Sequence, residues 1–204
     1  MKLTIIETGQ APASIRDQFP DYPEMVRRMF ARVDGGIQCE TVSIVRGDAL
    51  PDPASLGAVL YTGSPAGVYD PLPWIAPLKQ FIRSAAEART PQVGICFGHQ
   101  IMAEALGGKV TKSDKGWGVG RHTYEIVQCP DWSGSPCSPS LRIAVSHQDQ
   151  VIECPPSASV IARSDFTPHA ALYTARRGTS LAEADADAAV ASLEGDCDRH
   201  LLAK

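Results

Sequence analysis

The sequence lacks the marks of several classes of protein. No apolar stretch approaches the length that a bilayer-spanning helix needs. Lysine and arginine are scattered without a run, and the formal net charge is −4, so we expect neither nucleic acid nor a membrane surface as a partner. The pattern GxxxxGK[ST] is absent, so no P-loop nucleotide site is expected.

Paired cysteine motifs are also missing. The six cysteines are Cys39, Cys96, Cys129, Cys137, Cys154 and Cys197. Their spacing is irregular, and no CxxC occurs. Because the N-terminal MKLTIIETG reads as a first strand and not as a signal peptide, we expect a cytoplasmic location, where thiols stay reduced. We therefore predict no disulfide and no metal site, even where Cys129 and Cys137 flank a loop.

The chain is long enough for one globular domain with a substantial core. It has 204 residues, of which 44% are hydrophobic and 21% charged, an ordinary balance for a globular protein. Composition changes near the end, where residues 175–204 are rich in alanine and aspartate. We expect a domain over 1–174 and an atypical tail over 175–204, in which 180–194 could form a helix.

Strand and helix patterns alternate in the first half. Strands are predicted over residues 2–7, 37–45, 57–61 and 91–95, and helices over 22–33, 73–88 and 98–106. This alternation predicts an α/β fold with an open, mostly parallel, flavodoxin-like sheet flanked by helices. The second half is predicted to be β-rich, with short strands over 119–128, 141–146, 150–153, 158–163 and 170–174. The 22–33 helix is predicted from apolar residues at helical spacing, namely Met25, Val26, Met29, Phe30 and Val33.

The strongest chemical signal surrounds Cys96. A buried strand runs into Gly94-Ile95-Cys96-Phe97-Gly98, a G-x-C-x-G turn, and a helix follows. Such a turn forces an unfavourable backbone conformation on the nucleophile, and the glycines leave room for it. The helix N-terminus favours the thiolate. A lone cysteine at such a junction can also be a small buried hydrophobe, but the framing glycines favour a nucleophile.

Two backbone groups are candidates to stabilise an oxyanion. The N–H of Phe97 follows the nucleophile directly. The turn Thr62-Gly63-Ser64 ends a predicted parallel strand, at the sheet edge where open α/β sheets place their sites, so Gly63 is the second expected donor.

Four segments in order resemble one family. They are GAVLYTGSPAGVYD (57–70), GICFGHQIMAEALGGKV (94–110), GWGVG (116–120) and AVSHQDQV (144–151). Over about residues 1–173 the sequence resembles the class I glutamine amidotransferases, specifically the group similar to the amidotransferase domain of GMP synthase. The resemblance implies hydrolysis of the glutamine side-chain amide through a Cys96 thioester, without a cofactor. The ammonia would pass to a separate synthetase.

The resemblance also implies roles around the nucleophile. Gly63 and Phe97 would supply the oxyanion N–H groups. Gln100 would contact the substrate glutamine, and Ser146 and His147 would hold its α-amino and α-carboxyl groups, mainly through the backbone. Each has a plainer alternative, since Gln100 could cap the helix or face solvent, and Ser146 and His147 could anchor a turn.

Other polar and aromatic residues in these segments are expected to be structural. Trp117 is interpreted as a packing aromatic. His99 lies close to Cys96 in sequence but is expected to point elsewhere on the helix, so it is interpreted as structural.

The sequence departs from the family where the catalytic base should stand. The family activates its cysteine with a His-Pro-Glu motif after a late strand, and no His-Pro-Glu occurs in these 204 residues. His122 and His147 lie in other family segments, His169 falls one strand too early, and His200 has no glutamate two positions on. We therefore expect weak or absent glutaminase activity, and an exposed sheet edge where the missing strand would pair.

Three alternatives to an amidotransferase stay open. The chain could be a non-catalytic scaffold or regulator that keeps the fold. It could be a cysteine hydrolase of γ-glutamyl bonds, which would use the same machinery. A redox-active Cys96 is less favoured, because no resolving cysteine lies near it in sequence. The acceptor substrate and the oligomeric state do not follow from the sequence.

Overall fold

The structure is a computed structural model that describes residues 1–11, 16, 18–130 and 137–174. The predicted tail over 175–204, its possible helix at 180–194 and His200 lie outside the described residues.

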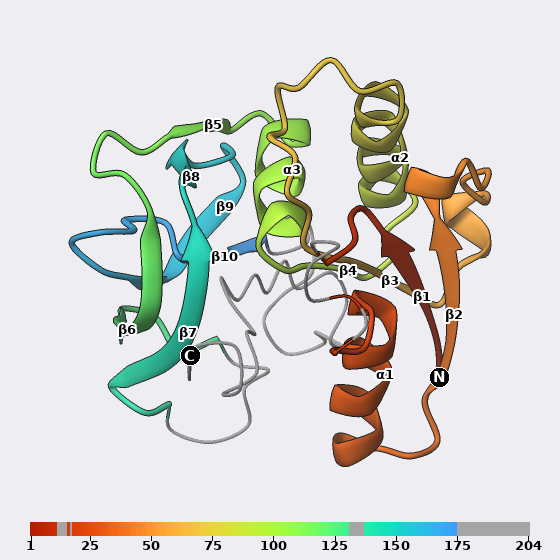
Figure 1. Ribbon diagram of the computed structural model, residues 1–204, viewed down its shortest axis with the longest axis horizontal. Helices are drawn as coiled ribbons and strands as arrows, with labels where there is room; N and C mark the ends of the chain where they lie inside the picture. The colour runs from red at the N-terminus through yellow and green to blue at the C-terminus, as the bar shows by residue number, and fades with distance from the viewer. Residues whose placement is uncertain (12–15, 17, 131–136, 175–204) are drawn as a thin grey trace.

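Four parallel strands form the sheet of the first half (Figure 1). They are β1 (Lys2–Glu7), β2 (Gln38–Ser43), β3 (Ala58–Tyr61) and β4 (Gln92–Gly94). Their order is β2-β1-β3-β4. From β1 the chain first adds β2 on one side, and then adds β3 and β4 on the other side. Among the described residues, β4 ends this sheet. The flavodoxin-like parallel sheet is confirmed, and its order places a switch point between β1 and β3, where ligand sites of such sheets form.

Helices cover both faces of this sheet. They are α1 (Tyr22–Val33), α2 (Ile75–Glu87) and α3 (Phe97–Ala105). Side chains alternate along each strand. One face of the sheet packs with Val26 of α1 through Leu3, Ile5 and Leu60. The other face packs with α2 and α3 through Ile6, Val59 and Tyr61.

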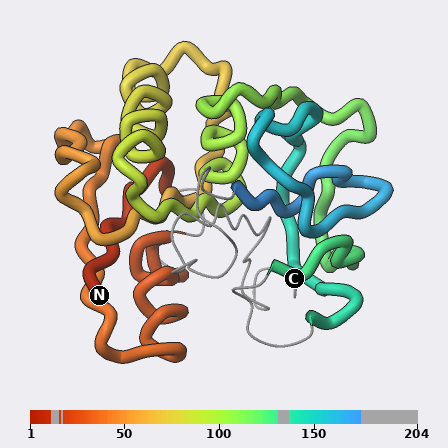
Figure 2. The backbone as a smooth tube through the Cα atoms, turned by 180° about the vertical axis from the view of Figure 1, so that it is seen from behind, coloured from red at the N-terminus to blue at the C-terminus, as the bar shows by residue number. Residues whose placement is uncertain are grey.

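The second half forms two antiparallel sheets. Their strands are β5 (Lys109–Lys112), β6 (Gly118–Ile126), β7 (Ser140–His147), β8 (Asp149–Glu153), β9 (Ala158–Arg163) and β10 (Ala171–Thr174). One sheet has the order β10-β9-β6-β7, and the other pairs β5 with β8. Figures 1 and 2 show α3 between the parallel sheet and these strands, and Val110, Val151 and Leu172 join the core that α3 shares. The predicted β-rich half is confirmed.

Local predictions failed at two places in the chain. The strand predicted over 37–45 ends at Ser43, because a 3-10 helix follows at Ile44–Arg46 and closes at Gly47 with φ 92°. β5 was not predicted, since it is short and alternates around a single buried valine, Val110.

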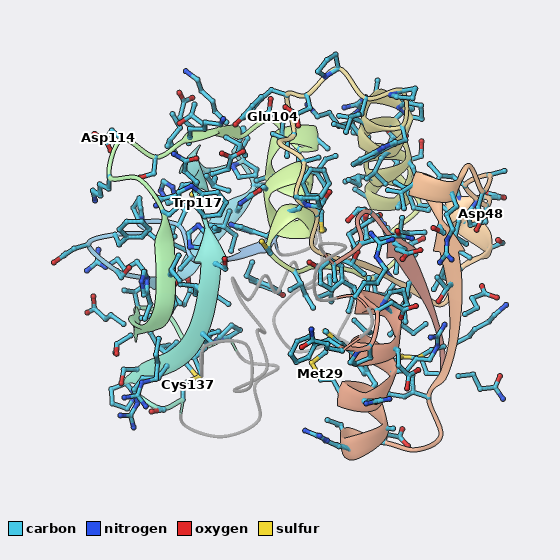
Figure 3. All side chains as sticks on the ribbon, in the orientation of Figure 1. Met29, Asp48, Glu104, Asp114, Trp117 and Cys137 are labelled. Carbon is cyan, nitrogen blue, oxygen red and sulfur yellow. A yellow bond between two sulfur atoms is a disulfide. The ribbon has the colours of Figure 1, made fainter. Side chains whose placement is uncertain are left out.

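The prediction that all cysteines stay reduced was wrong at one pair. Cys129 follows β6 and Cys137 precedes β7, and the pairing of β6 with β7 brings their Cα atoms to 5.7 Å, where a disulfide joins them. Figure 3 labels Cys137 at this end of the hairpin. Sequence spacing could not reveal the bond, because strand pairing creates the proximity.

The described residues contain no helix long and apolar enough to cross a bilayer. The same residues contain no group of three or more histidine, cysteine, aspartate or glutamate side chains arranged to hold a metal ion.

Candidate active site

Cys96 occupies a strained turn between β4 and α3. Its backbone has φ 54° and ψ −110°, and Arg89 is the other described non-glycine residue with positive φ. Residues other than glycine rarely adopt this conformation, and such outliers concentrate at functional sites. The turn places Cys96 at the N-cap position of α3, where the helix dipole favours a negative charge.

Two glycines allow this turn to pack. A Cβ atom on Gly94 would lie 2.4 Å from the carbonyl carbon of Gly98, and a Cβ on Gly98 would lie 2.3 Å from the carbonyl oxygen of Tyr61. Both distances are far below van der Waals contact. The glycines of the G-x-C-x-G pattern are therefore required by close approach of the turn to itself and to β3.

The structure brings Gly63 beside Cys96. The position of a Cβ on Gly63 lies 3.8 Å from the Cβ of Cys96. Phe97 is the first residue of α3, where backbone N–H groups lack acceptors within the helix. Its side chain is buried in an edge contact with Trp74, with ring centroids 5.7 Å apart, so the backbone is what Phe97 can present to a ligand. Both predicted oxyanion donors thus flank Cys96.

A buried threonine after β1 fixes the turn that holds Gly63. The hydroxyl of Thr8 donates to the carbonyl oxygen of Thr62 at 2.8 Å and also lies 3.2 Å from the carbonyl oxygen of Gly63, while the Thr8 N–H donates to Thr62 Oγ1 at 3.0 Å. The carbonyl of Thr62 and the N–H of Gly63 belong to one trans peptide and point in opposite directions. Because Thr8 holds that carbonyl, it also orients the Gly63 N–H away from itself.

A cavity of about 550 Å³ opens at the carboxyl ends of the parallel strands. Cys96, Gly63, Gln100, Ser146 and His147 all line it, so the structure gathers five of the six predicted site residues around one cavity. The sixth, Phe97, is not among the lining residues and follows Cys96 directly in the chain.

Gln100 and His147 both bind one backbone carbonyl. Gln100 is buried and donates through Nε2 to the carbonyl oxygen of Asp149 at 2.9 Å, while His147 donates to the same oxygen through Nδ1 at 3.2 Å. Gln100 therefore neither faces solvent nor caps its helix. It ties α3 to the start of β8.

Tyr69 closes one side of this arrangement. Its hydroxyl donates to Asp149 Oδ2 at 2.8 Å, which joins the loop after β3 to β8 across the cavity mouth. Burial, and then the hydrogen bond to Asp149, raise the pKa of Tyr69 to about 12, so the phenol stays a donor at neutral pH. Gly67 makes room for the ring, because a Cβ there would lie 2.8 Å from it.

Two of the other histidines serve the packing of the second half. His99 is fully buried, and its Nε2 bonds to the carbonyl oxygen of His169 at 3.0 Å. His169 in turn donates through Nδ1 to the carbonyl oxygen of Val151 at 2.9 Å. Burial lowers the pKa of His99 to about 4. Among the described histidines, His147 is the one that lines the cavity with Cys96.

Sequence reasoning missed part of the site. Thr8 and Tyr69 were not identified, although each follows a predicted strand that ends at the sheet edge. Trp117, interpreted as a packing aromatic, is instead 64% exposed and lines the cavity, because the chain between β5 and β6 carries it outside the core.

Fold and site together define a class: α/β domains that carry a cysteine on a strained turn between strand and helix. The class I glutamine amidotransferase family model matches residues 33–178. The chain belongs to the class I glutamine amidotransferase family.

Individual relatives have different named activities. The chain is 34% identical over 141 residues to γ-glutamyl peptidase 4 of Arabidopsis thaliana, covering 65% of this chain and 55% of that protein. It is 28% identical over 172 residues to the glutamine-hydrolysing GMP synthase of Thermomicrobium roseum, covering 81% of this chain and 31% of that protein. The chain spans about half the length of the first curated relatives it matches.

A solved structure of a glutamine amidotransferase from Methylobacillus flagellatus has the same fold. It superposes with a TM-score of 0.67 and 26% identity, over 85% of this chain and 65% of that one.

Proposed function

We propose that this chain is an amidotransferase-type acyl-transfer module in which Cys96 takes the γ-glutamyl group of glutamine as a thioester. The observation that carries the proposal is the strained Cys96 turn, with Gly63 beside it and Gln100, Ser146 and His147 around the same cavity. Family membership supports the same chemistry.

The reaction begins with attack of the Cys96 thiolate on the γ-carbonyl carbon of the substrate. The oxyanion that forms accepts hydrogen bonds from the N–H groups of Gly63 and Phe97. The carbon–nitrogen bond then breaks, and ammonia leaves with a proton from solvent. Water attacks the thioester, which releases glutamate and restores the thiol. Ser146 and His147 hold the α-amino and α-carboxyl ends, and Gln100 contacts the substrate through its amide.

The deacylation step lacks the usual family base. No His-Pro-Glu occurs in the 204 residues, so nothing of that kind activates water for the thioester. We propose that the 204-residue chain acylates through the thiolate that the α3 N-terminus favours, without the family base, and turns over slowly, with residues 1–174 as the working unit. A separate synthetase as ammonia acceptor and a cytoplasmic location stay predictions.

Ammonia release tests the proposal. The 204-residue chain is mixed with excess glutamine, and ammonia is followed in the first turnover and afterwards, beside a Cys96→Ala variant. We expect a burst of ammonia equal to the protein concentration, then a slow phase that exogenous imidazole accelerates because it can act as the missing base. A folded chain that gives no burst above Cys96→Ala would refute acylation and favour the scaffold alternative.

A second function is favoured by one observation. Several relatives are γ-glutamyl peptidases, and the cavity beside Cys96 is of the size that holds drug-sized ligands, which are much larger than glutamine. Hydrolysis of γ-glutamyl bonds to larger amines would use the same nucleophile and the same thioester.

A further inference from the structure

The cavity beside Cys96 has an apolar wall that the proposed chemistry does not use. Tyr22, Met25 and Met29 of α1 line it, at the i, i+3 and i+7 positions of one helix face. Tyr22 reaches the nucleophile region, since its ring lies 4.0 Å from the position of a Cβ on Gly63. Glutamine, with its polar amide and charged ends, offers this wall nothing to bury.

The two methionines are outside the core clusters of the fold. Val26, on the same helix, packs with the sheet strands, whereas Met25 and Met29 are partly exposed and belong to none of the three buried clusters. Methionine is flexible and polarisable, and it is common at surfaces that adapt to varied apolar partners. Val26 thus contacts both the sheet core and the cavity, whereas Met25 and Met29 line the cavity without joining a core cluster.

Exposed apolar side chains gather on the opposite wall. Trp117 is 64% exposed and Val119 is 56% exposed, and both line the same cavity. Figure 3 shows Met29 and Trp117 on opposite parts of the molecule, one on α1 and the other beside the strands of the second half. Exposed apolar surface grouped around one cavity marks a binding site better than scattered exposed residues do.

We propose that the apolar side chains on these two walls of the cavity bind a large apolar group carried on the amide nitrogen of a γ-glutamyl substrate. The proposal rests on the proposed function, because it assumes that the γ-glutamyl end is held at Cys96. The γ-carbonyl lies between Gly63 and Phe97, and the leaving amine extends toward Met25, Met29 and Trp117. The substrate class is therefore γ-glutamyl amides of bulky apolar amines; glutamine shares the γ-glutamyl end but carries no apolar group for these walls.

The chemistry balances without a further reactant. The Cys96 thiolate forms a bond to the γ-carbon, and the carbon–nitrogen bond breaks. The leaving amine takes a proton from water, and hydrolysis of the thioester returns glutamate and the thiol.

Binding and acylation are measured with two probes that differ only in the amine. The probes are γ-glutamyl-ethylamide and γ-glutamyl-2-naphthylamide. Their dissociation constants are measured by calorimetry on the Cys96→Ala variant, where no reaction interferes. Acylation of the unmodified chain is followed by intact-mass spectrometry.

We expect the naphthylamide to bind at least tenfold more tightly than the ethylamide, which corresponds to about 1.4 kcal/mol. Trp117→Ala and Met29→Ala, each added to Cys96→Ala, should remove most of this preference. Val33→Ala is the matched control, because Val33 is an apolar residue of α1 that is 81% exposed and does not line the cavity. Trp117 is exposed, so its replacement should leave the fold intact, which circular dichroism verifies.

The outcomes separate this inference from the function on which it rests. Equal affinity for the two probes, or equal effects of Trp117→Ala and Val33→Ala, would overturn the apolar subsite even if Cys96 acylates. Binding with the expected preference but without acylation by either probe would refute the proposed function.

Discussion

Replacing Thr8 with valine tests how the Gly63 N–H, the proposed oxyanion donor, is held in place. Valine has nearly the shape of threonine but no hydroxyl, so Thr8→Val removes the donor to the Thr62 carbonyl at 2.8 Å and leaves the packing unchanged. A buried carbonyl that loses its donor costs about 1–3 kcal/mol, which we expect as the fall in the free energy of unfolding. The peptide that carries the Gly63 N–H then loses its anchor.

The catalytic effect should be selective for reactions that form an oxyanion. We expect Thr8→Val to slow acylation of Cys96 by a γ-glutamyl amide at least tenfold, and by less than the roughly 100- to 1,000-fold that loss of a whole oxyanion donor costs. Alkylation of Cys96 by iodoacetamide forms no oxyanion, so its rate should stay unchanged. Thr8→Ser keeps the hydroxyl and should acylate near the unmodified rate.

Comparing acylation with alkylation shows whether Thr8 acts through the position of the Gly63 N–H. If Thr8→Val slowed acylation and alkylation equally, Thr8 would act on the cysteine or on the fold in general. If it slowed neither, the Thr8–Thr62 hydrogen bond would have no part in positioning Gly63.

Three further predictions concern stability and the cavity mouth. Gly98→Ala should lower the free energy of unfolding by about 1–3 kcal/mol in urea titration, because its Cβ would overlap a β3 carbonyl, whereas Gly63→Ala has room and should unfold like the unmodified chain. Tyr69→Phe removes the bond to Asp149 and should weaken γ-glutamyl amide binding severalfold, while equal affinity would remove Tyr69 from the site. His99 has a folded pKa near 4, below its ordinary 6.5, so the unfolded chain takes up its proton first and stability should fall by about 3 kcal/mol as pH drops from about 6.5 to 4. The His99→Gln variant should lose this part of the pH dependence, and an unchanged profile would contradict the assignment.

Local patterns predicted the framework of the fold. The helix over 22–33 matched α1, and the 2–7 strand matched β1, because each has a long apolar pattern with clear stops. The strand–cysteine–helix turn was also readable, since Gly94 and Gly98 bracket Cys96. What failed depended on partners distant in sequence: β5 is defined by its pairing with β8, and the Cys129–Cys137 bond by the β6–β7 hairpin.

In the candidate site, too, signals local in sequence could be interpreted, and features that depend on distant segments could not. Gly63 was predicted from the turn that ends a strand, Gln100 and His147 were implied by the family resemblance, and the structure brings all three to one cavity. Helical spacing predicted α1, but it could not show that Met29 lines the cavity without joining a core cluster, whereas Val26 both lines the cavity and packs on the sheet. That distinction depends on how the second half of the chain is placed against the first.

The central claim is that Cys96 accepts a γ-glutamyl group, and intact-mass spectrometry tests it most directly. The chain is mixed with excess γ-glutamyl amide, quenched in acid within the first turnover, and digested to locate any adduct. The account predicts a mass increase of one γ-glutamyl group on the peptide that contains Cys96, absent from Cys96→Ala. A folded chain that stays unmodified at Cys96, while iodoacetamide still labels that residue, would contradict it.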